Sequence, residues 1–182
     1  MSLYTYPNEN TQPVGLDAKI RDINTELSAL GWLTHQFERV WRTPETAERR
    51  VKTKFKTLSG DDFMTIAKND DVSAFSFFVA EGPESVIDNA QKAYEREVGL
   101  IMILNLPNVL INANYIATEE IKLQVQEILI NIPFAEYIRY HDNDPRRVFS
   151  GIDLENTGYE LTVWPYAALR FDLKLTYGAY CL

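Results

Sequence analysis

Side chains able to do chemistry are most concentrated around His141, one of 2 histidines in the chain. The segment His141-Asp142-Asn143-Asp144 combines an imidazole with two carboxylates. A zinc site usually draws on several His or Cys ligands. A calcium loop needs acidic ligands at alternate positions, an internal glycine and a closing glutamate between two helices. Asp142 and Asp144 have that spacing, but no glycine follows in register. We therefore interpret the segment as a solvated loop between two strands and expect no bound metal.

No nucleophile comes with neighbours that would activate it. Cys181 is the single cysteine, and at the end of a strand-like segment it resembles a small hydrophobic residue. Ser150 precedes Gly151, a pair typical of a turn, and the G-x-S-x-G turn of hydrolases is absent. The 8 glycines form neither a G-x-G-x-x-G segment nor a P-loop. The sequence therefore predicts no catalytic residue and no cofactor.

A short match to metal-dependent nucleases occurs at Glu120-Ile121-Lys122. In such a centre a carboxylate holds the metal and a lysine steadies the attacked phosphate, both from a strand. Here the pair opens an expected helix, where residues i and i+2 point in different directions. We interpret the match as fortuitous. Two further acidic pairs lie in expected loops and are interpreted as turn formers: Asp61-Asp62 and Asp70-Asp71.

Positive charge is concentrated in one segment of a chain whose formal net charge is −8. A molecule with one basic patch and an acidic remainder can attract copies of itself head to tail. The basic residues from position 49 onward are therefore the candidate subunit interface. They are Arg49, Arg50, Lys52, Lys54 and Lys56, preceded by Arg39 and Arg42. Lysine alternating with uncharged residues is also typical of the solvated face of an ordinary strand, so both interpretations stay open.

The composition fits a folded domain. A chain of 182 residues can bury one core, and a hydrophobic content of 46% excludes wholesale disorder. The longest apolar run is far shorter than the ~18 residues of a membrane helix, and no signal peptide is visible. We therefore expect synthesis in the cytoplasm and no membrane partner. The acidic balance also argues against a general nucleic-acid binder.

The clearest pattern lies near the C-terminal end, where apolar and polar residues alternate from Ala168 to Tyr177. Such alternation predicts a strand with one buried face. The expected buried residues are Leu169, Phe171, Leu173, Leu175 and Tyr177. The expected solvated residues are Arg170, Asp172, Lys174 and Thr176.

Three amphipathic helices are expected elsewhere. A stripe at spacings of three and four predicts the first over residues 16–30, ended by Gly31. Pro83 favours a second over residues 83–94. Thr118 can cap a third that Pro133 stops.

Strands are predicted between and around these helices. They span residues 37–42, 51–58, 74–79, 100–106, 136–140, 147–149 and 160–164, whereas 63–67 is ambiguous. A hairpin at residues 165–167 joins the last of them to the terminal strand. This order predicts an α+β fold with a mainly antiparallel sheet packed by two to three helices. Residues 1–13 are expected to form a polar N-terminal arm, and residues 14–182 a single domain.

The expected layout has a first helix followed by three distinctive segments. They are residues 37–41 (Phe-Glu-Arg-Val-Trp), 71–78 (Asp-Val-Ser-Ala-Phe-Ser-Phe-Phe) and 169–177 (Leu-Arg-Phe-Asp-Leu-Lys-Leu-Thr-Tyr). With the chain length, they resemble the tail terminator, or tail-completion, proteins of tailed bacteriophages and prophages. Residues 108–118 and 141–145 have no counterpart in that pattern.

Members of that family are compact α+β subunits that form a ring closing the head-proximal end of the tail tube. The resemblance implies a non-enzymatic virion assembly subunit in the tail or neck. It implies contacts with copies of itself and with other tail or neck proteins. The family has no catalytic residues to carry over.

Two other functions stay open at this level. An enzyme or small-molecule-binding domain can assemble an aromatic pocket only on folding, although the same aromatic residues can simply fill a core. These residues are Trp32, Trp41, Trp164, Tyr166 and the group at 75–78. A binder of single-stranded nucleic acid would use the lysines of residues 52–56 with Phe55. Net negative charge and a phenylalanine on the opposite face count against it.

Overall fold

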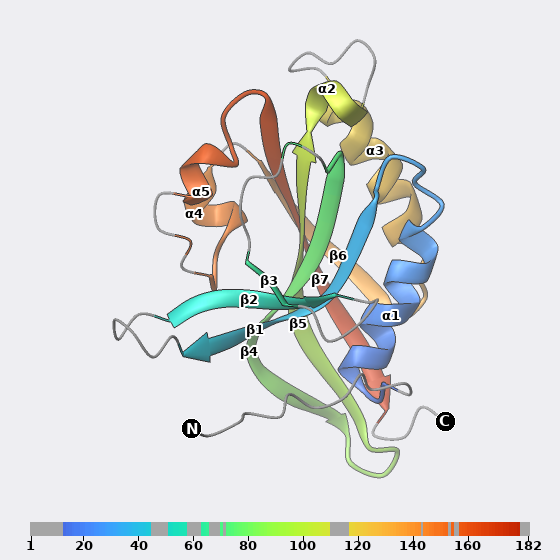
Figure 1. Cartoon of the computed structure of the whole chain (residues 1–182). Coiled ribbons are helices and arrows are strands. Elements are labelled where there is room, and N and C mark those ends of the chain that lie inside the picture. The colour runs from blue at the N-terminus through green and yellow to red at the C-terminus, as the bar shows by residue number, and fades with distance from the viewer. Residues whose placement is uncertain are drawn as a thin grey trace.

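The computed structural model describes most of the chain. The described residues are 13–44, 51–57, 63–65, 70, 72–109, 117–142, 144–152, 154 and 157–178, with the backbone alone at 41–44, 51–57, 63–65, 117 and 157. They form a single α+β domain built on a mainly antiparallel sheet, which confirms the predicted fold class (Figure 1). The predicted N-terminal arm and Cys181 lie outside the described residues.

The sheet has seven strands in the order β3-β2-β1-β4-β5-β7-β6. Their bounds are β1 His35–Pro44, β2 Val51–Thr57, β3 Phe63–Thr65, β4 Ala74–Asp88, β5 Ala93–Asn105, β6 Ala135–Asp142 and β7 Tyr166–Gly178. β1 and β4 run parallel, and the other neighbouring pairs are antiparallel. β7 therefore lies inside the sheet, between β5 and β6.

Strand β1 divides its pairing between two neighbours. It pairs with β4 from His35 to Arg39 and with β2 from Phe37 to Pro44, mostly beyond Arg39. The register with both neighbours shifts in between, as at a β-bulge. The second half of β1, together with β2 and β3, is called the outer ribbon, and it projects sideways from the body (Figure 1).

Two helices cover one face of the sheet, α1 (Leu16–Leu27) and α3 (Ala117–Ile130). Both match predicted helices, and the predicted apolar stripes are the buried sides. The stripes are Leu16, Ile20, Ile23 and Leu27 in α1, and Ile121, Val125 and Leu129 in α3. They pack on the inward residues of β7, which confirms the predicted buried face: Leu169, Phe171, Leu173, Leu175 and Tyr177. A short helix, α2 (Leu106–Val109), follows β5.

The other face carries two short helices, α4 (Pro145–Val148) and α5 (Thr157–Glu160). The strands predicted at 147–149 and 160–164 are therefore wrong, and so is the hairpin at 165–167, because β7 begins at Tyr166. Asp144 explains why residues 147–149 are not a strand. Its side chain accepts a hydrogen bond from the backbone N–H of Arg146 and caps α4, and Pro145 lies in the first turn of that helix. These helices cover a second core that includes Phe77, Ile101 and Phe149.

The helix predicted over residues 83–94 is also wrong. β4 and β5 continue as one long hairpin, in which Val86 pairs with Tyr94. Tyr94 stacks on Tyr177 of β7 with ring centroids 6.2 Å apart, and the Tyr177 hydroxyl donates to Glu84. Cross-strand contacts with β7 therefore override the helical spacing in this segment. No helix in the described residues is long and apolar enough to cross a membrane.

Candidate functional site

A buried ion-pair network lies on the α4 side of the sheet. Arg170 and Asp172 of β7 are 1% and 5% exposed, so the prediction that both are solvated is wrong. Arg170 Nε donates to Asp172 Oδ1 over 2.6 Å, and its Nη2 lies 2.6 Å from Glu81 Oε1 of β4. Of the other two residues on this side, Thr176 is exposed as predicted and Lys174 is half-buried.

The same guanidinium attaches the α4 segment to the sheet. Arg170 Nη1 donates to the carbonyl oxygens of Ser150 and Val148, over 2.9 and 3.4 Å. Gly99 of β5 makes room for this group, because a Cβ at that position would lie 2.5 Å from Arg170 Cζ. Two sequence signals mark the arrangement: an Arg and an Asp two residues apart on one strand face, and a glycine within an apolar strand.

We expect Gly99→Ala to lower the free energy of unfolding by about 1–3 kcal/mol, because the added methyl group must displace a guanidinium held on three sides. Urea unfolding followed by tryptophan fluorescence measures the loss. Gly31→Ala is the matched control, since nothing lies within 4 Å of a Cβ there. Equal effects of the two substitutions would contradict the close fit at Gly99.

Asp172 also binds the edge strand β6. Its Oδ2 accepts a hydrogen bond from Arg139 Nε over 2.6 Å and lies 3.3 Å from His141 Nε2. Burial raises the pKa of Asp172, but hydrogen bonds and charges from Arg139 and Arg170 outweigh it and hold the pKa below its usual value. A His-Asp pair can orient a catalytic base, but no described serine, threonine or cysteine hydrogen-bonds to His141. The network therefore has the features of a structural ion-pair cluster.

The other segments considered for metal chemistry do not converge. The Tyr140 hydroxyl donates to Asp142 over 3.3 Å, whereas Asp144 caps α4 and pairs with Arg147 at 3.3 Å. Within the described residues, no three His, Cys, Asp or Glu side chains are placed to hold a metal ion.

The Glu120-Ile121-Lys122 segment lies on α3, as predicted. Lys122 Nζ pairs with Glu119 at 2.9 Å, while the Glu120 carboxylate accepts from Gln124 over 3.5 Å. The two groups of the nuclease-like match thus have different partners.

The aromatic residues considered for a pocket are distributed over the molecule. Phe75, Phe77, Phe78 and Tyr166 belong to the cores. The Trp32 indole N–H donates to Gln124 Oε1 over 2.8 Å. Trp164 is 58% exposed, and the Trp41 side chain lies outside the described atoms.

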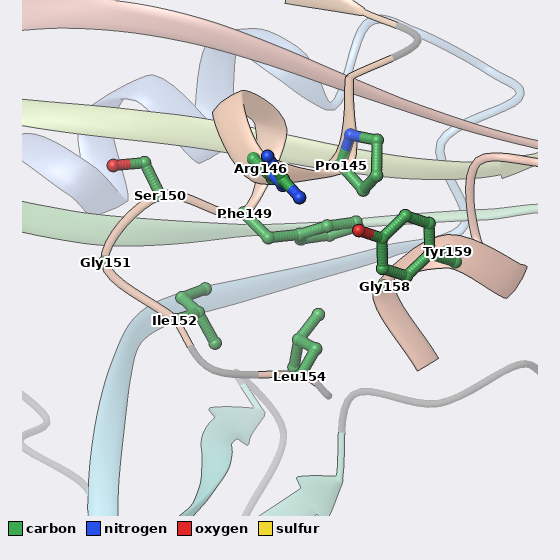
Figure 2. A pocket seen from close by; sticks show the side chains of 9 residues that line it. All are labelled: Pro145, Arg146, Phe149, Ser150, Gly151, Ile152, Leu154, Gly158 and Tyr159. Carbon is green, nitrogen blue, oxygen red and sulfur yellow. The ribbon is translucent and has the colours of Figure 1, made fainter. Parts of the chain in front are cut away.

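A separate hollow of about 420 Å³ lies between α4 and α5 (Figure 2). Phe149 lies across it between Pro145 and Ile152, and Tyr159 projects from α5 at one side. The lining residues are Pro145, Arg146, Phe149, Ser150, Gly151, Ile152, Leu154, Gly158 and Tyr159. None of these is a histidine, cysteine or carboxylate, so among the described lining residues Tyr159 is the side chain of a type that can transfer a proton.

The candidate interface lies mostly on β2, in the outer ribbon. Lys54 pairs with Trp41 of β1 and Thr65 of β3 in the backbone register, and Lys52 and Lys56 flank it along the strand. Arg49, Arg50 and the lysine side chains lie outside the described atoms. The ribbon is at the opposite end of the strand order from β6.

No protein-family model, curated protein or solved structure matches this chain.

Proposed function

We propose that this protein is a non-enzymatic assembly subunit that forms a ring with copies of itself, of the tail terminator type in phage or prophage virions. One observation carries the proposal: the two ends of the sheet are unlike. The outer ribbon stands at one end and the edge strand β6 at the other. Two unlike surfaces meet head to tail, and such contacts make a ring when the rotation closes.

Charge distribution supports this arrangement. The ribbon strand β2 carries three lysines in a chain of net charge −8. A basic strand at one end and acidic residues elsewhere favour attraction between copies and disfavour stacking of like ends. Other tail or neck proteins are the expected second class of partner.

The ionisable groups of the described residues also support a non-enzymatic role. Arg170, Asp172 and Arg139 are engaged in pairs that join strands to each other and α4 to the sheet. Enzyme sites instead place perturbed groups in a cleft where a substrate can reach them.

We expect the triple change of Lys52, Lys54 and Lys56 to Glu to abolish assembly and leave the fold intact. The physical reason is that the basic contact becomes repulsive toward an acidic neighbour. Light scattering and negative-stain imaging, with the tail partner present, measure assembly. Since exposed charges are screened within about 10 Å at 0.1 M salt, the parent ring should also loosen as salt rises.

A matched control changes Lys19, Arg146 and Arg147 to Glu, which gives the same shift in net charge away from the ribbon. The pair formed by Arg147 joins exposed residues three apart and contributes little. Lys19 Nζ also lies 4.3 Å from the centre of the Phe134 ring, so the unfolding midpoint of the control is measured alongside its assembly. The control should assemble as the parent does. A folded triple-lysine variant that assembles normally would overturn the role of β2.

A further inference from the structure

Strand β6 forms an open edge of the sheet. It pairs with β7 on one side, and no described strand lies along its other side. An open edge presents backbone N–H and C=O groups to a further strand, and proteins commonly guard it with outward charges. The charged side chains of β6 are exposed but paired, since Arg139, 55% exposed, pairs with Asp172 and Glu136, 69% exposed, pairs with Lys174.

The residue at the middle of this edge is apolar. The register between β6 and β7 shifts between Tyr137 and Arg139, so Ile138 has no partner in the ladder. Its side chain is 38% exposed. The middle of the edge therefore carries an exposed apolar side chain between the charged residues Glu136 and Arg139.

Helix α3 adds an apolar surface beside β6. Gln126 Nε2 donates to the Tyr137 hydroxyl over 2.7 Å, and Lys122 Nζ lies 5.0 Å from the centre of the Tyr140 ring. The next row outward on the helix holds Leu123 and Ile130, which share a face because they are seven residues apart. They are 62% and 66% exposed, the highest values among the large hydrophobic residues of the described chain.

Acidic residues surround this apolar surface. Glu119, Glu120 and Glu127 are exposed on α3, and the Glu136 side chain of β6 is 69% exposed. The ribbon strand β2 alternates lysine with Val51, Thr53 and Phe55. A strand of that composition carries the cations that an acidic surface attracts.

We infer that the edge of β6 with Leu123 and Ile130 of α3 receives the outer ribbon of a second copy. The inference rests on the proposed ring. In this contact β3 of one copy lies beside β6 of the next, so the sheet continues between subunits. The contact brings the lysine-bearing strand β2 near the glutamates of α3 and covers Leu123 and Ile130.

The first test changes both Leu123 and Ile130 to Asp. Because both side chains are exposed, the variant should keep the parent's unfolding midpoint. Its dissociation constant for assembly should rise about tenfold or more, since buried apolar anchors dominate such contacts. The matched control changes Val86 and Val163 to Asp, which are 54% and 61% exposed on other surfaces. The control should assemble as the parent does.

The second test uses paired cysteines in a Cys181→Ser background. Ile138→Cys combined with Thr65→Cys should give a ladder of disulfide-linked oligomers on oxidation. Val163→Cys combined with Thr65→Cys should give none. If the parent assembles, the variant with Leu123 and Ile130 changed to Asp assembles equally well, and the paired cysteines give no ladder, this contact is wrong. The proposed ring is not affected by that result. A parent that forms no oligomer, even with its tail partner, overturns the proposed function and this contact with it.

Discussion

Asp172→Asn is expected to lower the free energy of unfolding at pH 7 by about 3–5 kcal/mol, the cost of removing one partner from a buried ion pair. Arg170 is 1% exposed and stays charged, because a guanidinium does not deprotonate in proteins. Glu81 alone then remains to balance it. Urea unfolding at pH 7 measures the loss. Asp22→Asn, which breaks the exposed pair with Lys19, should cost less than about 1 kcal/mol.

The same variant should change the acid sensitivity of the protein. Pairing holds the pKa of Asp172 below its unfolded value of about 4, so its contribution is fully present above that pH. The contribution is lost as pH falls through the lower, folded pKa. Stability of Asp172→Asn should therefore depend less steeply on pH below about 4 than that of the parent. Parallel pH curves for the two proteins would contradict the pairing.

Phe171→Ala is expected to cost about 3–5 kcal/mol, the usual loss for a fully buried aromatic ring. Phe171 is 0% exposed, and its ring centroid lies 5.2 Å from that of Tyr140. Its strand is held on both sides, by β5 and β6. Denaturant unfolding measures the effect, and Thr176→Ala, on the exposed side of the same strand, is the control. A loss below about 1 kcal/mol would mean that β7 is not central to the fold.

The spacing of apolar residues correctly predicted those elements in which the buried residues repeat regularly along a single strand or helix. The apolar face of β7 and the stripes of α1 and α3 were identified because each repeats over ten or more residues. The helix predicted over residues 83–94 is wrong because the same spacing of apolar residues also fits a hairpin. The pairing of β5 with β7 favours the hairpin. The cap provided by Asp144 likewise favours α4, and a helix of 4 residues is too short to show a periodic pattern.

The candidate site was predicted in part. Alternation shows which residues share a face, but not whether a distant segment covers that face, so Arg170 and Asp172 were placed in solvent. The clustered lysines of β2 were visible in the sequence. The surface beside β6 was not, although Leu123 and Ile130 fall outside the buried stripe of α3 and carry a readable signal. Their nearness to an open edge depends on the tertiary fold.

The divided pairing of β1 has a mechanical consequence. One unbroken strand runs from the outer ribbon into the main sheet, where its first half lies parallel to β4. A pull along β1 would load the hydrogen bonds to β4 in shear, with all of them sharing the force. A strand pulled sideways instead loses its bonds one at a time, at lower force. Tension taken up by the ribbon would thus pass directly into the most deeply packed part of the domain.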